Sequence, residues 1–535
     1  MSRTEKILLP LAALLLGLSA YVQIEAGNAA DKGWLLLAAK EWLSGKRLYV
    51  DIFELNPPLI VWLYAIPVWI AQHIQLLRDA KMLAILGLLA TAFVIRLSIS
   101  LLARHPAFAG EKHRQYAFAL LLAIVFIFLT APMYFFDREH IMLVLTFPYV
   151  LRFMPSLARQ ALPLPVRVLI GLLAAAGFCM KPHALVVFAV LQLLFILRER
   201  GAAILWSVEN VIVYLLGGSY VAYVALCMPE YLHIVIPMAM ATYYAYSRKA
   251  DGVFNIILFV VMMGLTFADF RRRYDSPYRR DIYYFLGVSC AWLAYALLNN
   301  GWSYTYQPLL SMARITSGWV LMEFLWLGRD AEARGLPARP FLFGARACVF
   351  NLAANVAFYA IVFTVFLIPV NCDGDIHCRS SQSFMKQAKA VNAKSFGVMT
   401  VAFYKWTGLS RETGARWDTR FNHLWMLPKF ILSDEAFARK NQWITDYVSH
   451  AYAEDMNQRK PEVMFIDTSP EIFSGHANID LPAHFSTTPG FREEWKHYAR
   501  VGVIDACEQP RANEHDADPV KADCRFDIYR RNTAP

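Results

Sequence analysis

Long apolar segments alternate with short polar segments over the first 370 residues of the chain. Because a helix needs roughly 20 apolar residues to cross a bilayer, this pattern predicts a series of membrane-spanning helices, several with poorly defined ends. Twelve apolar segments occur, near 7–23, 58–73, 83–103, 116–131, 140–154, 166–179, 183–197, 208–227, 253–268, 282–298, 308–327 and 347–370.

Clusters of lysine and arginine predict the orientation of these helices, because cytoplasmic loops of membrane proteins carry an excess of both residues. All the clusters lie on one side only if segment 58–73 does not cross. That segment is short and contains Pro67, so we expect it to lie on the outer leaflet. This leaves about eleven crossings, with the N-terminus in the cytoplasm and the C-terminus outside. The clusters lie near 3–6, 104–114, 159–167, 198–200, 271–280 and 329–346.

Residues 371–535 alternate between helix-like and strand-like patterns, which predicts a small α/β domain with a mostly parallel sheet. We therefore expect a multi-pass α-helical membrane domain over 1–370 and an extracytoplasmic α/β domain over 371–535. Helical patterns appear near 380–394 and 433–448, and strand-like runs at Phe396–Phe403, Val463–Asp467, Val501–Ile504 and Phe526–Tyr529.

Composition agrees with a membrane protein, since 57% of the residues are hydrophobic and only 18% are charged. Soluble proteins carry about 25% charged residues. The net charge of +10 could indicate a nucleic-acid partner. The basic residues lie in short clusters between apolar segments, however, which is typical of membrane topology and not of a phosphate-binding groove.

The eight cysteines fall into two groups of four. The first group lies in or beside apolar segments and is expected to be buried: Cys179, Cys227, Cys290 and Cys348. The second group lies in the exported region and predicts two disulfides with three alternative pairings: Cys372, Cys378, Cys507 and Cys524. Zinc is the alternative for this second group, although the spacing does not match a zinc ribbon.

Two outward loops carry candidate carboxylates. In loop 24–82, Asp31 stands before an amphipathic helix predicted over 32–44 and ended by Gly45, so helix capping is one explanation for it. Loop 132–140 contains Asp137-Arg138-Glu139-His140. Four polar groups beside the hydrocarbon region are costly unless they are solvated, paired or functional.

Cations and aromatic residues occupy the other outward loops. Lys181-Pro182-His183 interrupts an apolar stretch, where Lys181 either holds a lipid phosphate or snorkels from an ordinary turn. Further candidates for substrate binding are Arg248 in the fourth outward loop, Trp302 and Tyr304 in the fifth, and Arg314 in the following helix. The aromatic residues could equally form an interfacial belt, and Arg314 either snorkels outward or faces a polar cavity.

These loops would place carboxylates and cations on one face of the membrane. A carboxylate can deprotonate an acceptor hydroxyl, and cations can stabilise the charge on a departing phosphate. Chemistry on a lipid-linked phosphate needs this combination.

The order of these motifs resembles the GT-C superfamily of polyprenyl-phosphate-sugar-dependent glycosyltransferases, of which the lipid A aminoarabinose transferases and protein O-mannosyltransferases are members. The resemblance lies in Asp31, the amphipathic helix, Gly-x-x-x-Tyr-x-Asp over 45–51 and Pro57-Pro58-Leu59. It continues in the second-loop acidic residues and the Lys-Pro break at 181. Asp137-Arg138-Glu139-His140 and Gly301-Trp302-Ser303-Tyr304 look like motifs of a bacterial branch of the superfamily.

The resemblance implies that Asp31 activates the acceptor, that Asp137 or Glu139 is its companion, and that Lys181 lies near the lipid phosphate. This chain departs from many relatives in having Lys32 after Asp31, and Glu54-Leu55-Asn56 where a lysine often precedes the prolines. The departures leave open the donor sugar, a substrate-binding role for Glu54, and a divalent metal at Asp31 and Asp137.

We therefore expect an inverting sugar transferase of the bacterial inner membrane. It would use a polyprenyl-phosphate-linked donor and a lipid, polysaccharide or protein acceptor at the outer face. The alternatives are a transporter of a lipid-linked saccharide and a non-catalytic membrane scaffold. A transporter would need charges in mid-membrane, of which the apolar segments hold few.

Overall fold

The chain forms two compact units in the computed structural model. The helical unit comprises residues 1–26, 76–223 and 248–368, and the sheet unit comprises 27–75, 224–247 and 369–535. The domain boundary predicted at residue 370 stays a prediction. The structure describes residues 3–25, 30–158, 160–199, 202–243, 252–261, 263–264, 278–299, 302–333, 349, 385–401, 406–433, 435–468, 480–505 and 525–532.

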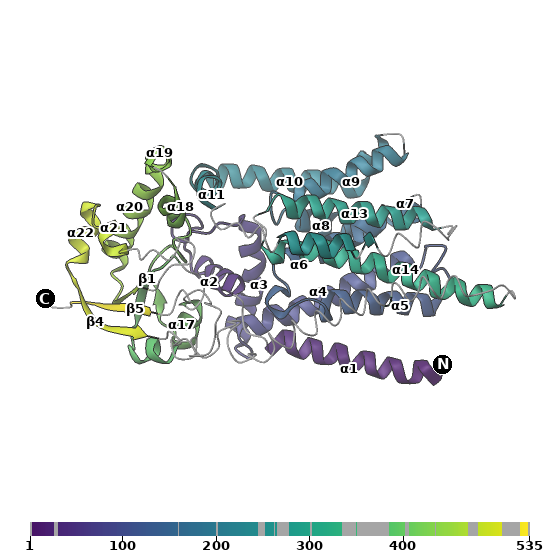
Figure 1. Cartoon of the computed structure of the whole chain (residues 1–535), viewed down its shortest axis with the longest axis horizontal. Helices are drawn as coiled ribbons and strands as arrows, with labels where there is room; N and C mark the ends of the chain where they lie inside the picture. The colour runs from purple at the N-terminus through teal and green to yellow at the C-terminus, as the bar shows by residue number, and fades with distance from the viewer. Residues whose placement is uncertain are drawn as a thin grey trace. The chain divides into compact units, whose positions relative to one another are not determined.

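The helical unit consists of long helices that run side by side (Figure 1). They coincide with the predicted apolar segments from 7–23 to 308–327, apart from 58–73, which lies in the sheet unit. Segment 253–268 is only partly described, and 347–370 lies almost wholly outside the described residues. The long helices are α1 (Arg3–Glu25), α4 (Asp79–Leu102), α5 (Lys112–Ala123), α6 (Arg138–Arg152), α8 (Leu164–Phe178), α9 (Ala184–Glu199), most of α10 (Val208–Cys227), α13 (Arg279–Leu297) and α14 (Gln307–Ala333). Shorter turns are η1 (Ile124–Phe128), η2 (Pro132–Tyr134), α7 (Pro155–Ala158), η3 (Ala203–Trp206) and η6 (Ser303–Tyr306).

Two of the described helices, α4 and α10, are long and apolar enough to cross a membrane by length and composition. The number of crossings and their orientation stay predictions. Shorter apolar helices in the described chain are Ala13–Glu25, Pro58–Ile74, Leu164–Phe178, Ala184–Arg198, Tyr231–Thr242 and Gly252–Val261.

Helix α6 is the most enclosed element of the helical unit. It packs against α4, α8 and α14, and almost every residue along it is buried. The approach of α8 is close enough that a Cβ added at Gly177 would lie 2.6 Å from Thr146 Cγ2. Small residues permit such close backbone packing between membrane helices. Helix α6 is therefore held firmly on several sides.

Three of the four cysteines in or beside apolar segments differ from the prediction, and the fourth, Cys348, lies outside the described residues. Cys227 and Cys290 are exposed on apolar helices, and Cys179 is half-buried. Apolar helices of a membrane protein bury only the faces that meet other helices, so hydropathy alone does not predict burial within the chain. The four cysteines expected to form disulfides lie outside the described residues.

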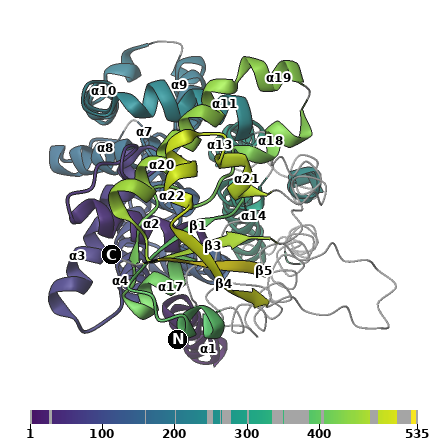
Figure 2. The same cartoon turned by 90° about the vertical axis from the view of Figure 1, so that its left-hand side faces the viewer.

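The sheet unit contains a five-stranded mixed sheet in the order β2-β1-β3-β5-β4, and Figure 2 shows β3, β5 and β4 side by side. β1 pairs in parallel with β2 and β3, whereas β5 runs antiparallel to both β3 and β4. The sheet predicted as mostly parallel is mixed, with two parallel and two antiparallel pairings among the described strands. Alternating helix and strand patterns do not reveal strand direction. The last strand in the chain, β5, lies between β3 and β4. The strands are β1 (Ser395–Met399), β2 (Arg416–Trp417), β3 (Val463–Asp467), β4 (Tyr498–Asp505) and β5 (Arg525–Arg531).

Element bounds in the sheet unit agree only in part with the sequence prediction. The strand at Val463–Asp467 is confirmed, β1 is shorter than expected, and β4 is longer. The helix predicted over 433–448 is two helices, α19 (Glu435–Lys440) and α20 (Gln442–Arg459). The remaining C-terminal helices are α17 (Trp406–Thr413), α18 (Leu427–Leu432), α21 (Leu481–Phe485) and α22 (Pro489–Trp495).

The predicted first outward loop forms part of the sheet unit. It contains α2 (Ala30–Leu43) and α3 (Pro58–Ile74), and the unit also includes η4 (Tyr231–Val235) and α11 (Ile236–Thr242). Gly45, with a φ of +99°, follows the end of α2 as predicted. Asp31 lies inside the first turn of α2, so it does not precede the helix as a capping residue would. The Phe53 amide donates to the Arg420 carbonyl at 2.8 Å, which joins this segment to the C-terminal region.

Candidate functional site

Glu139, in the first turn of α6, is the centre of a buried polar cluster in the helical unit. Its side chain is almost fully buried, and its Oε1 accepts from Lys181 Nζ and, at 3.0 Å, from the Tyr295 hydroxyl. The other oxygen, Oε2, is buried without a hydrogen bond from any described residue. Buried carboxylate oxygens are normally satisfied, so Oε2 is an acceptor open to a ligand.

Two cations flank this carboxylate. Arg138 Nε lies 4.0 Å from Glu139 Oε2, and Lys181 pairs with Oε1. Both cations lie near the ring of Tyr304, with the Arg138 Cζ 5.7 Å and the Lys181 Nζ 5.2 Å from its centroid. Trp302 stacks beside Tyr304, their centroids 6.4 Å apart. Arg138 and Lys181 thus flank Glu139, Tyr304 lies within cation–π range of both, and Trp302 stacks on Tyr304.

Backbone hydrogen bonds around the start of α6 fix the side chains of Asp137 and His140. Asp137 is the N-cap of α6 and accepts from the Arg138 amide at 2.8 Å. His140 Nδ1 accepts from the Phe136 amide at 3.2 Å, and Nε2 lies 2.8 Å from the Phe126 carbonyl. Because a carbonyl only accepts, Nε2 bears the proton. Both ring nitrogens contact backbone, which favours a positioning role for His140; substrate binding by it stays a prediction.

Lys181 and His183 lie in the break between α8 and α9, as the sequence predicts. The Lys181 side chain is only 11% exposed, so it does not snorkel freely into solvent. A substrate-binding role for His183 stays a prediction.

Asp31 and Glu54 belong to the sheet unit. Asp31 is partly buried in the first turn of α2. Glu54 is buried, with Oε2 accepting from Trp34 Nε1 at 2.5 Å and Oε1 accepting from the Asn56 amide at 2.7 Å. Glu54 therefore stabilises the turn before α3, and a substrate-binding role for it stays a prediction.

Arg314 and Arg248 are the two remaining predicted binding residues. Arg314 is fully buried within α14, which excludes outward snorkelling at this position. Arg248 lies outside the described residues. Among the described residues, no group of three or more His, Cys, Asp or Glu side chains could hold a metal ion. A metal at Asp31 or Asp137 stays a prediction.

Sequence reasoning missed Tyr295, a fully buried residue that donates directly to Glu139. It lies near the end of the apolar segment 282–298, where a tyrosine is typical of the membrane interface. The available signal was its place one turn before Asn299, at the same outward end as Trp302 and Tyr304.

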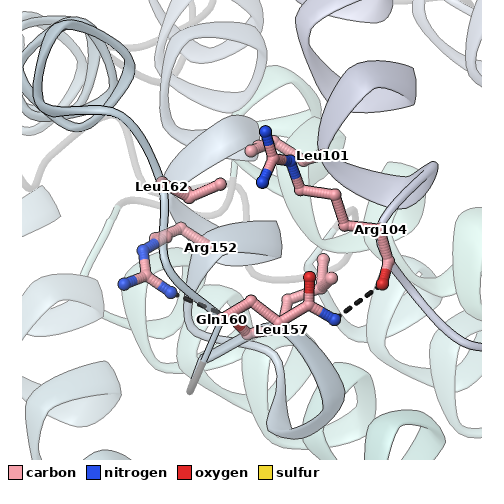
Figure 3. Close-up of a pocket in the computed structure, with 6 residues that line it drawn as sticks. All are labelled: Leu101, Arg104, Arg152, Leu157, Gln160 and Leu162. Atoms are coloured by element: carbon pink, nitrogen blue, oxygen red, sulfur yellow. Dashed lines mark hydrogen bonds between the residues drawn. The ribbon is translucent and has the colours of Figure 1, made fainter.

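A small cleft in the helical unit lies far from Glu139 along α6. Figure 3 shows Arg104 and Arg152 at this cleft, with Gln160 donating to the Arg104 carbonyl at 2.6 Å. Arg152 follows Glu139 by about four turns of α6, or roughly 20 Å. Arg152 also pairs with the buried Glu209 at 2.8 Å. The cleft is therefore distinct from the Glu139 cluster, and its arginines already have protein partners.

Comparison with solved structures finds two similar crystal structures of ArnT from Cupriavidus metallidurans. The apo structure matches with a TM-score of 0.50 and 10% identity, over 88% of this chain and 94% of that one. The structure bound to undecaprenyl phosphate matches with a TM-score of 0.54 and 11% identity, over 99% of this chain and 98% of that one. At this identity the likeness shows the fold alone, which is ArnT-like over nearly the full length.

Sequence comparison adds no nearer relative. No protein-family model matches the chain, and no curated protein matches it. The functional argument therefore depends on the fold and on the geometry of the chain's own residues.

Proposed function

We propose that this protein is a membrane glycosyltransferase that moves one sugar from a polyprenyl-phosphate carrier to an acceptor at the outer face of the bacterial inner membrane. The ArnT-like fold supports the proposal, because ArnT was crystallised with undecaprenyl phosphate. The motif order in the first, second and third outward loops agrees with the same class.

The observation that supports the proposal best is the buried Glu139 carboxylate, with one satisfied oxygen, one open oxygen and two adjacent cations. A hydroxyl of the donor sugar can donate to Oε2, which orients the donor and leaves the proton of the acceptor hydroxyl for a separate base. Lys181 and Arg138 can neutralise a phosphate as it departs. Charges in a site shielded from water act more strongly than the same charges in solvent.

The proposed reaction is a single inverting displacement. The acceptor oxygen forms a bond to the anomeric carbon while the bond from that carbon to the phosphate oxygen breaks. The electron pair leaves with the polyprenyl phosphate, and the acceptor proton passes to a carboxylate. We assign Asp31 as this base, Glu139 as the orienting carboxylate and Asp137 chiefly as the cap of α6.

The test is mass spectrometry of polyprenyl-phosphate lipids from cells that lack the protein. A lipid-linked sugar should accumulate in the deletion and remain with Asp31→Asn or Glu139→Gln, whereas wild type should clear it. Glu435→Gln is a matched control, because the Glu435 side chain is 92% exposed, and it should clear the lipid as wild type does. Full clearance by both site variants would refute the assignment.

A further inference from the structure

A small cleft in the sheet unit lies between one face of α2 and the segment that follows β2. Trp34 and Glu41 line it from α2, and Trp417 and Thr419 line it from the C-terminal region. Its free volume is about 220 Å³. Most of this volume opens to solvent, and the enclosed part admits one small polar group such as a hydroxyl.

Two polar side-chain atoms in the lining have no partner. Trp417 is 3% exposed and Thr419 is 2% exposed. The Trp417 Nε1 and the Thr419 Oγ1 are both buried without a hydrogen bond from any described residue. An unsatisfied buried polar group costs about 1–3 kcal/mol, so a small polar group, either a water or a ligand hydroxyl, satisfies these two atoms.

The charged residues at the cleft compensate one another. Glu41 pairs with Lys46, and Arg420 contacts Asp455 at 3.0 Å. The remaining carboxylate, Asp51, lies 3.5 Å from an arginine of α20. A free phosphate or cation therefore gains little here. A hydroxyl fits better, because it can accept from the Trp417 N–H and donate to the Thr419 oxygen.

The cleft shares a helix face with the proposed base. Residues three or four apart lie on the same face of an α-helix, and Asp31, Trp34, Leu37 and Glu41 follow this spacing. A ligand bound along this face would extend toward the first turn of α2, where Asp31 lies.

We propose that this cleft binds a sugar hydroxyl of the acceptor, so that the acceptor is a saccharide or carries one. The inference rests on the proposed transferase function and adds the chemical class of the acceptor. Trp417 would donate to the bound hydroxyl, and Thr419 would accept from it. Neither residue is assigned to the displacement itself.

Saturation-transfer NMR on the full-length protein, in a detergent without sugar groups, tests this assignment. The probes are free glucose, galactose, mannose, N-acetylglucosamine and arabinose. At least one should give a signal that falls fivefold or more in Thr419→Val, a change of nearly equal shape, and in Trp417→Phe. Trp443→Phe is the control, because Trp443 is a partly exposed tryptophan of α20, and it should keep the signal.

The inference is overturned if no probe gives a signal, or if the signal persists in Thr419→Val. Glu139→Gln should abolish transfer but leave saccharide binding unchanged, because Glu139 belongs to the other unit. If Thr419→Val and Trp417→Phe lose saccharide binding but keep full transfer, only the assignment of the cleft to the acceptor is refuted. Saccharide binding by the wild-type protein without any transfer activity would instead refute the proposed function.

Discussion

Separate and joint removal of the Glu139–Lys181 ion pair should give strongly non-additive losses of stability. The two side chains are 2% and 11% exposed, so each charge depends on the other for compensation. Removing one member of a buried pair costs about 3–5 kcal/mol, whereas replacing both is often nearly neutral.

The structure predicts which single change is worse. In Lys181→Met, Glu139 keeps Arg138 Nε at 4.0 Å and the Tyr295 hydroxyl at 3.0 Å, so the loss should be near 3 kcal/mol. In Glu139→Gln, the ammonium of Lys181 loses its carboxylate, so the loss should approach 5 kcal/mol. The double variant should lose about 2 kcal/mol or less, because neither charge remains.

The assay is thermal unfolding of the purified full-length protein, followed by tryptophan fluorescence at one fixed scan rate. Each single variant should lower Tm by about 5–10 °C, and the double variant should recover most of that loss. Glu493→Gln removes an exposed partner of Lys496 and should leave Tm unchanged. A double variant as unstable as the two single losses combined would show that the pair is not coupled.

Three further perturbations test other parts of the account. Tyr295→Phe removes one hydrogen bond to Glu139, worth about 1.5–3 kcal/mol. Transfer in a lipid turnover assay should therefore fall about tenfold to a hundredfold while the protein stays folded, and unchanged turnover would contradict this. Gly177→Val should lower Tm by several degrees because the added carbons meet Thr146, whereas Gly218→Ala, where a Cβ meets nothing within 4 Å, should not. Burial lowers the pKa of His423 to about 3, so the unfolded chain binds a proton between pH 6.5 and 3 that the folded chain does not. Hydrogen exchange should therefore detect about 2 kcal/mol less protection in the sheet unit at pH 4.5 than at pH 7, and His423→Leu should reduce the difference.

The helical unit was predictable because hydrophobic segment length reports directly on helix formation in a membrane protein. Helices α4, α8 and α10 lie within a few residues of their expected ranges. Strand direction in the sheet was not predictable, because β5 inserts between β3 and β4 by long-range pairing. Nothing in the local pattern of residues 525–531 distinguishes parallel from antiparallel pairing.

The site was predictable in its residue types but not in its contacts. Glu139 and Lys181 were both candidates, yet 42 residues separate them, and only helix packing brings them together. Tyr295 was hidden within an apolar segment. Thr419 and Trp417 carry no motif, and their unsatisfied polar atoms become visible only after the chain has folded.

The most direct test of the central claim uses the lipid that accumulates in deletion cells and the purified protein. We predict that the wild-type protein, given this lipid and an acceptor fraction from the same cells, consumes the lipid-linked sugar and releases one polyprenyl phosphate for each sugar transferred. Glu139→Gln should leave the lipid intact. Persistence of the lipid-linked sugar with the wild-type protein, or its equal consumption by Glu139→Gln, would contradict the account.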